Sequence, residues 1–375
     1  MFNKIHHLIP RNKRIWVFGS RLGYRYDENS KYLFEYVNRN VPDIRAIWLT
    51  RSQKVFDHLK RNGREVYIMN SLAGYFYSSV AGAAIISICL HDVNNEAISG
   101  AQIINLWHGT PLKKTDIFGM GEKYDLVILS AEEFLHNNLL GDNTKSHFVL
   151  TGYPRNDILL SSIKVESIEQ LKVRYQCEKI VLYLPTYRDA LLPDGNTTYI
   201  KEFNLFESFG FKSGRLEDLM RQYKALFVIK LHPANVLQNT NLIKRIHKSH
   251  YLYLVDPDDP LQDVYEYMKY ADVLITDYSS VCYDFLLLNR PIIFAPFDFD
   301  NYIRQRPLGL PYEEVTPGPK AKKWDELCAI LEEVLAGRDD WAQWREIINR
   351  RFNAYRDDKN SERVCKKIKS FLEIE

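Results

Sequence analysis

The sequence predicts an α/β protein built from two doubly wound, Rossmann-like domains that face each other across a cleft. A length of 375 residues suggests about two domains. Apolar strands alternate with amphipathic helices in two consecutive sets, a pattern typical of parallel sheets with helices on both faces. A hydrophobic content of 46% supplies enough apolar side chains for a core in each domain.

The first domain is expected to span residues 1–162. Its strands are predicted from short runs of branched and aromatic side chains that end at turn-forming residues. In chain order, the expected strands are 15–18, 45–49, 84–88, 103–107, 126–129 and 147–150. The join to the second domain is expected near residues 154–164.

The second domain is expected to span residues 163–345. It begins with a helical stretch near 168–175, and its expected strands are 180–184, 226–231, 252–255, 273–276 and 292–295. Asp259-Pro260 is expected to open a helix, because aspartate caps helices and proline suits the first helical position. The last helices, expected over 341–355 and 361–372, contribute a C-terminal segment (346–375) that packs back across the domain join.

Charge and cysteine content argue against several classes of function. Lys and Arg number 50 against 48 Asp and Glu, so bulk charge gives no reason to expect nucleic acid as a partner. Five scattered cysteines without CxxC spacing suggest reduced thiols in a cytoplasmic protein. No EF-hand, HExxH or Walker A pattern is present, and no cofactor is predicted.

Both ends of the chain are basic. The cationic side chains there are Lys4, Arg11, Lys13 and Arg14 at the start, and Arg363, Lys366, Lys367 and Lys369 at the end. Such partly apolar segments suit an anionic membrane surface, and solvated chain ends are the alternative. The longest apolar run, 81–90, is too short to span a bilayer, and the start lacks the apolar core of a signal peptide.

The segment 272–291 is the most informative part of the chain. An apolar strand (273–276) leads through Asp277 and Tyr278 to Ser279 and Ser280, where a helix is expected to begin. Hydroxyls and unpaired backbone N–H groups at a helix N-terminus form an anion site, and phosphate is the usual occupant. The alternative is that one of the serines only caps the helix.

Two histidines follow expected strands, one in each domain. Ligands of open α/β sheets collect beyond the carboxyl ends of the strands, where His108 and His232 are placed. His108 is the candidate general base, because imidazole accepts a proton near neutral pH, and His232 could neutralise a phosphate. Gly109 would leave room for a substrate, and Lys113 or Lys114 could hold an acceptor phosphate. For either histidine the alternative is a hydrogen-bonded residue at the start of a loop.

Other polar residues at strand ends complete the set of candidates. Arg155 and Arg188 could clamp phosphate oxygens through two parallel hydrogen bonds, although Arg155 could also belong to a capped helix start. Asp277 could orient a histidine or a ribose hydroxyl, or simply form a turn. Thr110 joins Gly109, Lys113 and Arg155 as a further candidate for acceptor or phosphate binding, with a plain turn as the alternative. Asp284 is expected to hydrogen bond back toward Ser280.

Taken together, these motifs resemble the CDP-glycerol glycerophosphotransferase family, which includes teichoic acid primases and polymerases and related capsule enzymes. The matching segments are WHGTPLKK at 107–114, GYPRND at 152–157, PTYRD at 185–189, HP at 232–233, TDYSS at 276–280 and PGP at 317–319. The ordered set is specific and covers nearly the whole chain. Two positions depart from the family pattern: Asp358 stands where glycine is frequent, and Tyr187 where tryptophan is common.

The resemblance implies a GT-B architecture, with the donor nucleotide on the C-terminal domain, in a peripheral enzyme at the cytoplasmic face of the membrane. The implied reaction transfers glycerol phosphate from CDP-glycerol to a hydroxyl of a lipid-linked or polymeric acceptor and releases CMP. His108 would deprotonate that hydroxyl. His232, Arg188 and the Ser279/Ser280 helix start would hold the diphosphate. Fixed cations and N–H groups can do this work, so no metal is implied.

Three alternatives remain open from the sequence. The donor could be CDP-ribitol. The same fold could carry a nucleotide-sugar glycosyltransferase or epimerase, because a fold does not determine the chemistry. A catalytically inactive polymer-binding subunit is the third alternative, and the presence of both histidines and both serines speaks against it.

Overall fold

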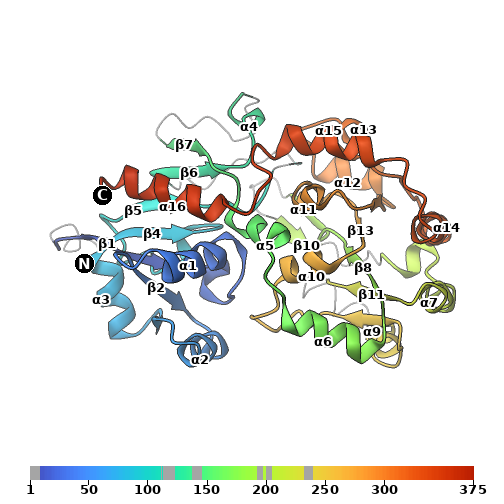
Figure 1. Ribbon diagram of the computed structural model, residues 1–375, viewed down its shortest axis with the longest axis horizontal. Helices are drawn as coiled ribbons and strands as arrows, with labels where there is room; N and C mark the ends of the chain where they lie inside the picture. Colours follow the sequence, from blue (N-terminus) through green and yellow to red (C-terminus); the bar gives the residue numbers. More distant parts are fainter. Residues whose placement is uncertain are drawn as a thin grey trace.

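The computed structural model describes residues 9–110, 112, 123–136, 146–191, 197–199, 205–231 and 240–375. Two parallel sheets form an N-terminal and a C-terminal half that lie side by side (Figure 1). The first sheet has the order β3-β2-β1-β4-β5-β6-β7. Its strands are β1 (Asn12–Phe18), β2 (Arg45–Thr50), β3 (Val66–Ile68), β4 (Ala81–Ile86), β5 (Gln102–Asn105), β6 (Leu126–Leu129) and β7 (His147–Leu150).

The second sheet is parallel as well and has the order β12-β11-β8-β13-β14. Its strands are β8 (Lys179–Leu184), β11 (Ala225–Ile229), β12 (Leu252–Leu254), β13 (Val273–Thr276) and β14 (Ile292–Phe294). In each half the chain starts in the middle of the sheet and winds outward in both directions. The strand order therefore reverses between β1 and β4 and between β8 and β13, and ligands of doubly wound sheets bind at such points.

Helices cover the sheets of both halves (Figure 1). The N-terminal half has α1 (Glu28–Asn40), α2 (Gln53–Arg61), α3 (Leu72–Val80), α4 (Glu133–His136) and α5 (Asp157–Leu160). The C-terminal half has α6 (Glu166–Tyr175), α7 (Ser213–Gln222), α9 (Thr240–Ile246), α10 (Val264–Tyr270), α11 (Val281–Phe285), α12 (Phe299–Gln305), α13 (Tyr312–Val315) and α14 (Trp324–Leu335). Within the described ranges, no helix combines the length and apolarity needed to cross a membrane.

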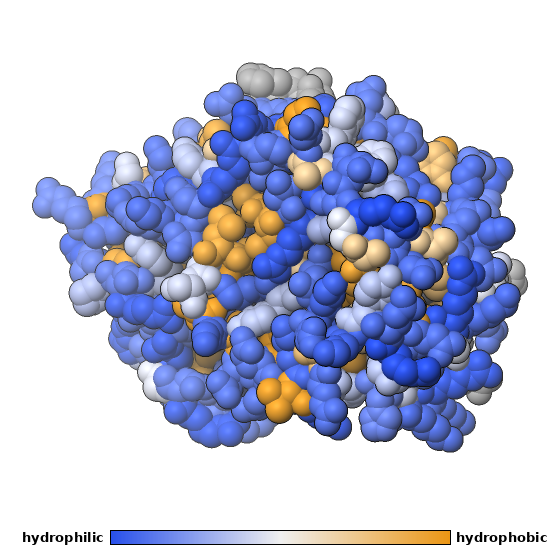
Figure 2. Space-filling view, turned by 45° about the vertical axis from the view of Figure 1, so that its right-hand side comes forward, coloured by the Kyte–Doolittle hydropathy of each residue, from blue (hydrophilic) through white to orange (hydrophobic). Residues whose placement is uncertain are grey.

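Each half has an aromatic core. In the N-terminal half Trp48 packs edge-on against Tyr26 and Phe34, with ring centroids 4.8 and 5.4 Å apart. In the C-terminal half the buried Trp324 stacks on Phe206 and donates its indole N–H to a backbone carbonyl. With the apolar residues buried in this way, most of the surface seen in Figure 2 is hydrophilic, and hydrophobic side chains gather in a patch near its centre.

The last two helices lead the chain from the C-terminal half back to the N-terminal half. Helix α15 (Ala342–Phe352) packs in the C-terminal half, where Asn353 at its end donates to the carbonyl of Tyr283 at 2.7 Å. Helix α16 (Asn360–Phe371) then lies against α1 (Figure 1). Its first N–H groups, those of Asn360 and Ser361, both donate at 2.8 Å to the carboxylate of Asp157.

The expected helix at Asp259-Pro260 is wrong. Helix α10 begins only at Val264, and Asp263 is its cap. The reason lies in the interface between the halves. There Arg25 donates a hydrogen bond to the carbonyl of Asp259, and the N–H of Tyr26 donates one to the carbonyl of Pro260. These contacts hold the segment 259–262 as a turn against the N-terminal half, and the regular helix begins after it.

Other differences are small. The strand expected at 103–107 ends at Asn105, whose side chain accepts the N–H of Trp107 (φ 56°) and turns the chain away from the sheet. Strand β3 and the antiparallel pair of β9 (Asp189–Leu191) and β10 (Thr197–Tyr199) were not predicted.

Some of the basic side chains near the two chain ends are engaged by the protein itself. Arg11 donates to backbone carbonyls, including that of Ser78 at 2.7 Å, and Lys369 pairs with Asp43 at 3.1 Å. The apolar side chains of the tail, Val364 and Ile368, are fully buried. The tail therefore presents basic side chains on its outer face, but its apolar side chains are not available to a membrane.

Candidate active site

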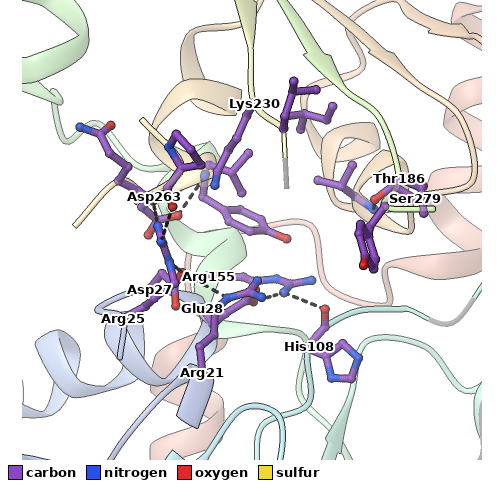
Figure 3. Close-up of a pocket in the computed structure, with 18 of the residues that line it drawn as sticks. Arg21, Arg25, Asp27, Glu28, His108, Arg155, Thr186, Lys230, Asp263 and Ser279 are labelled. Atoms are coloured by element: carbon purple, nitrogen blue, oxygen red, sulfur yellow. Dashed lines mark hydrogen bonds and ion pairs between the residues drawn. The ribbon is translucent and has the colours of Figure 1, made fainter. Parts of the chain in front are cut away.

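A cavity of about 500 Å³ lies between the two halves (Figure 3). It is lined on one side by segments that follow β1, β5 and β7, and on the other by segments that follow β8, β11, β12 and β13. Every contributing strand thus points its carboxyl end at this space, where parallel sheets bind their ligands.

The cavity brings together four of the residues selected from the sequence. His108, Arg155, Ser279 and Ser280 line it, whereas Gly109, Thr110, Arg188 and Asp277 lie behind its wall. His232, Lys113 and Lys114 lie outside the described residues. One end of the cavity therefore carries the candidate base and the candidate phosphate site together.

The two serines form the turn between β13 and α11. The hydroxyl of Ser279 accepts the N–H of Val281 at 3.4 Å, so Ser279 is the residue that caps the helix start. Ser280 already has helical backbone angles, and its side chain makes no capping hydrogen bond. Both the capping interpretation and an anion site at this turn are compatible with this geometry.

Arg188 and Asp277 do not reach the cavity as phosphate clamps would. Arg188 is 2% exposed and binds Asp298 with two nitrogens at 2.9 Å and Asp277 with a third contact at 2.8 Å. The other carboxylate oxygen of Asp277 accepts the N–H groups of Thr186 and Tyr278. Because all these groups are engaged internally, they hold the loops after β8 and β13 in register and leave phosphate contact to other residues.

His108 sits on a tightly held loop after β5. The carbonyls of Leu106 and Trp107 accept hydrogen bonds from the side chain of Asn29, and the carbonyl of His108 itself accepts one from Arg155 at 2.9 Å. The His108 side chain is exposed, and its ring lies 4.2 Å from that of Trp107. The backbone is fixed while the imidazole faces open space, as a general base requires.

The space beside Gly109 is occupied by side chains of the protein and is not open to a substrate. Its φ of 139° is accessible almost only to glycine, and a Cβ there would come within 2.8 Å of Ser280 Oγ and 2.9 Å of Arg155 Nη2. The His108 loop thus touches the start of α11 in the other half. Thr110 is fully buried and shares a hydrogen bond with Ser130 at 2.9 Å, which makes it part of the core.

Arg155 is the centre of a buried network between the halves. Its guanidinium donates to Glu28 of the N-terminal half and, at 2.8 Å, to Asp284 on α11 of the C-terminal half. The ring of Tyr265 lies 4.7 Å away, and the Tyr265 hydroxyl donates to Asp284 at 2.5 Å. Asp284 was expected to bond toward Ser280, and this expectation is wrong because Arg155, Asn156 and Tyr265 occupy its oxygens.

Charges in this network stabilise one another. Burial on its own would lower the pKa of Arg155, but the Tyr265, Asp284 and Glu28 groups around it hold the pKa well above the usual value. Burial would likewise raise the pKa of Glu28, yet the neighbouring cations, Arg21 first among them, keep it below the usual value. Arg155 and Glu28 therefore stay charged at any practical pH.

Sequence reasoning missed a group of cations in the cavity. Arg21 and Arg25 belong to the loop between β1 and α1, where Arg21 pairs with Asp27 and Glu28. Lys230 directly follows β11, and burial lowers its pKa to about 8, with Arg25 adding to the shift. The place of Lys230 next to the His232-Pro233 motif is a signal that could have identified it.

The residues described contain no cluster of three His, Cys, Asp or Glu side chains placed to hold a metal ion. The charged groups of the cavity wall are instead arranged as cations, Arg21, Arg25, Arg155 and Lys230, interleaved with carboxylates. Such a wall suits a ligand that carries anionic groups, for example a nucleoside diphosphate derivative.

Comparisons with known proteins agree with this geometry. A sequence profile of the family described as CDP-glycerol:poly(glycerophosphate) glycerophosphotransferase matches residues 1–370. A teichoic acid glycerol-phosphate transferase of Staphylococcus aureus is 25% identical over 95% of this chain and 93% of its own length. A teichoic acid poly(ribitol-phosphate) polymerase of Bacillus spizizenii is 29% identical over 72% of this chain, which spans only 43% of that protein.

A solved structure of the wall teichoic acid polymerase TagF superposes with a TM-score of 0.72, at 21% identity, over 99% of this chain and 93% of that one. Two facing doubly wound halves with a cavity between their strand ends define the GT-B class of group-transfer proteins, and the predicted fold class is confirmed. Within that class, the chain belongs to the CDP-glycerol glycerophosphotransferase family, as its motifs predicted.

Proposed function

We infer that the protein transfers glycerol phosphate from CDP-glycerol to a hydroxyl of a teichoic acid or capsule acceptor and releases CMP. The observation that carries this is the shared cavity, in which His108 of the N-terminal half and Ser279 and Ser280 of the C-terminal half line one space. The acceptor would enter from the His108 side. The donor diphosphate would lie against the start of α11.

The reaction then needs little beyond positioning and charge. His108 accepts the proton of the acceptor hydroxyl while its oxygen attacks the phosphorus that carries glycerol. The bond from that phosphorus to the bridging oxygen breaks, and its electron pair leaves with CMP. Ser279, Ser280 and nearby N–H groups contact the phosphates, while Arg188 and Asp277 keep this wall in shape from behind. His232 stays a predicted phosphate ligand.

The direct test is acceptor-dependent release of CMP from CDP-glycerol, with a lipid-linked disaccharide as acceptor. Wild type should release CMP, and His108→Ala should lose at least about 100-fold in kcat, since general base catalysis contributes about that much. The His108→Ala protein should retain its affinity for CMP, because the donor wall is untouched. Release by His108→Ala at the wild-type rate would contradict the assignment of the base.

CDP-ribitol is the second candidate donor, and the similarity to a ribitol-phosphate polymerase favours including it. The polyol lies beyond the phosphates, so the contacts proposed for Ser279 and Ser280 serve either donor equally. Competition between CDP-glycerol and CDP-ribitol in the same release assay distinguishes them. A kcat/KM larger for CDP-ribitol would reassign the donor without changing the site.

A lipid-linked acceptor requires the protein to work at a membrane surface, and helix α3 is the best candidate for contact. It lies at the outer end of the N-terminal half, and its Leu72 and Phe76 side chains are 92% and 58% exposed on one face. Leu72→Asp/Phe76→Asp should reduce sedimentation with anionic vesicles. Val173→Asp on α6 is the matched control, because Val173 is 77% exposed on another helix. Equal loss with both variants would remove α3 from the proposal.

A further inference from the structure

Lys230 stands apart from the other cations of the cavity. Its backbone N–H continues the β8–β11 ladder by donating to the carbonyl of Tyr183, which fixes the residue at the strand end. From there the side chain extends into the cavity (Figure 3). Lys230 therefore projects from the donor wall on a rigid element and not from a loose loop.

The other cations in the cavity wall are paired with carboxylates or carbonyls of the protein. Arg25 binds Asp27 and the carbonyls of Asp259 and Gln262, each at 2.9 Å. Arg155 is held by two carboxylates, and Arg21 pairs with Asp27 and Glu28. The carboxylates of Asp27 and Glu28 are thus paired with these arginines.

Lys230 differs from these arginines in its pairing. Among the described residues, none accepts a hydrogen bond from its ammonium group or pairs with it at salt-bridge distance. The nearby carboxylate of Asp263 is bound by Lys31 at 2.9 Å, and residues 232–239, which follow Lys230, contain no Asp or Glu. Burying an ammonium group without a partner costs desolvation free energy, and the charge of an anionic ligand would offset this cost.

We propose that Lys230 is a phosphate ligand of the donor, whose ammonium group binds the diphosphate of the CDP-alcohol opposite the Ser279/Ser280 turn. This rests on the proposed function. Lys230 stays protonated throughout: the hydroxyl proton goes to His108, the new bond forms at the phosphorus bearing the polyol, and the electron pair of the broken bond stays on the departing CMP. The lysine stabilises the negative charge that grows on that leaving phosphate.

Two variants with a matched control test the proposal. Lys230→Met should weaken binding of CDP-glycerol and of inorganic pyrophosphate about 10- to 100-fold, the usual worth of a hydrogen bond to a charged group, while Lys230→Arg retains part of it. Lys179→Met is the control. Lys179 begins β8 at the opposite end of the same sheet, where its ammonium group donates to the carbonyl of Leu335 and lies 5.9 Å from the ring of Tyr223.

The pH dependence gives a second readout. The charged groups facing Lys230 are Arg21, Arg25, Asp27 and Asp263, of which the two arginines lower its pKa and the two aspartates raise it. With its pKa at about 8, Lys230 loses its charge above that pH, so wild-type affinity for pyrophosphate should fall as pH rises from 7 to 9. Lys230→Met should bind weakly and show no such fall.

Stability of the unliganded protein separates binding from a structural role. A lysine whose folded pKa is below its unfolded one destabilises the fold at low pH, and this cost disappears as pH rises toward the unfolded value. Lys230→Met should therefore melt at or above the wild-type temperature at pH 7. A lower melting temperature, or unchanged pyrophosphate affinity, would overturn the proposal.

Pyrophosphate binding and CMP release together distinguish failure of the proposed function from failure of the role proposed for Lys230. If wild type binds pyrophosphate through Lys230 but releases no CMP from CDP-glycerol or CDP-ribitol, the phosphate site stands and the donor is another nucleotide. If CMP is released at unchanged kcat and KM by Lys230→Met, the function stands and the role of Lys230 falls. If wild type binds neither pyrophosphate nor any CDP-alcohol, both are refuted.

Discussion

Two buried arginines, one in each half, are built alike and connected differently. Arg155 binds Glu28 and Asp284, donates to the carbonyl of His108, and lies 4.7 Å from the ring of Tyr265. The Tyr265 hydroxyl in turn donates to Asp284. One guanidinium thus joins two carboxylates, one carbonyl and one tyrosine.

Arg188 repeats every part of this arrangement. It binds Asp277 and Asp298, donates to the carbonyl of Thr186 at 2.6 Å, and lies 5.1 Å from the ring of Tyr278. The Tyr278 hydroxyl donates to Asp298 at 3.0 Å. Both arginines are 2% exposed, so neither network is screened by solvent.

The difference lies in where the partners come from. All partners of Arg188 belong to the C-terminal half, whereas Arg155 joins Glu28 and the His108 loop to Asp284 on the helix that follows the two serines. Arg188 supports the wall proposed to bind the donor, and Arg155 connects that wall to the loop of the candidate base. The two networks should therefore separate donor binding from turnover.

Arg155→Met should have the largest effect. It leaves Asp284 buried without its cation, and Glu28 with Arg21 alone, which costs about 3–5 kcal/mol of unfolding free energy. It also frees the His108 loop, and a displacement of about 1 Å at a reacting group costs about 100-fold in kcat. CMP affinity, measured by calorimetry, should stay within about threefold of wild type, since the serine turn belongs to the other half.

A triple variant provides the control for stability. Arg155→Met with Glu28→Gln and Asp284→Asn removes the unpaired charges and should recover part of the unfolding free energy, but not kcat. Recovery of kcat together with stability would mean that Arg155 acts only on folding. A loss of CMP affinity as large as the loss of kcat would break the distinction between the two arginines.

Arg188→Met should lower stability by a similar amount, about 3–5 kcal/mol, because Asp277 and Asp298 lose their partner. Its functional effect should fall on the donor instead. With Asp277 released, the loops after β8 and β13 lose their register, and CMP affinity should drop about tenfold. The fall in kcat at saturating donor should be the smaller effect, and the opposite order would contradict the assignment.

Gly109→Ala tests the contact between the halves more gently. The added Cβ would meet Ser280 Oγ at 2.8 Å and Arg155 Nη2 at 2.9 Å, at a φ of 139°. Strain and crowding should cost about 1–3 kcal/mol in thermal unfolding and about tenfold in kcat. Gly337→Ala is the control, since Gly337 has a φ of 96° and no atom within 4 Å of the added Cβ. It should lower stability without lowering kcat.

The strands and the residues that they bring to the cavity could be predicted from the sequence. Strands at 126–129 and 273–276 lie where they were predicted, because each is an apolar run closed by polar turn residues. His108, Ser279 and Ser280 share one cavity for the same reason, since parallel strands deliver their carboxyl ends to one edge of each sheet. The family followed from the order of these motifs.

The connections between the motifs could not be predicted. Arg155 and Asp284 are 129 residues apart in the chain, and no local pattern indicates that they pair. Both arginines were interpreted as phosphate clamps because guanidinium binds phosphate and carboxylate through the same geometry. Only burial distinguishes the two uses, and burial of a strand-end residue depends on the other half of the protein.

The smallest effects come from a matched pair of hydroxyl deletions. Tyr265→Phe and Tyr278→Phe each remove one O–H donor to a buried carboxylate, Asp284 or Asp298, and should each cost about 1–2 kcal/mol of unfolding free energy. Burial raises the pKa of both tyrosines, so both hydroxyls remain protonated and the effects should not vary between pH 6 and 9.

Their functional effects should diverge as those of the arginines do. Tyr265→Phe loosens the Arg155 network and should lower kcat about threefold with CMP affinity unchanged, a modest cost for a partner that leaves the ion pairs in place. Tyr278→Phe should weaken CMP binding about threefold with kcat unchanged. Because the two deletions are chemically identical, a difference between their effects on kcat and on CMP affinity must come from their surroundings. A shared pattern of kcat and affinity would contradict the proposed division of roles. It would mean that the two halves respond as one unit and that the division between donor wall and base position is wrong.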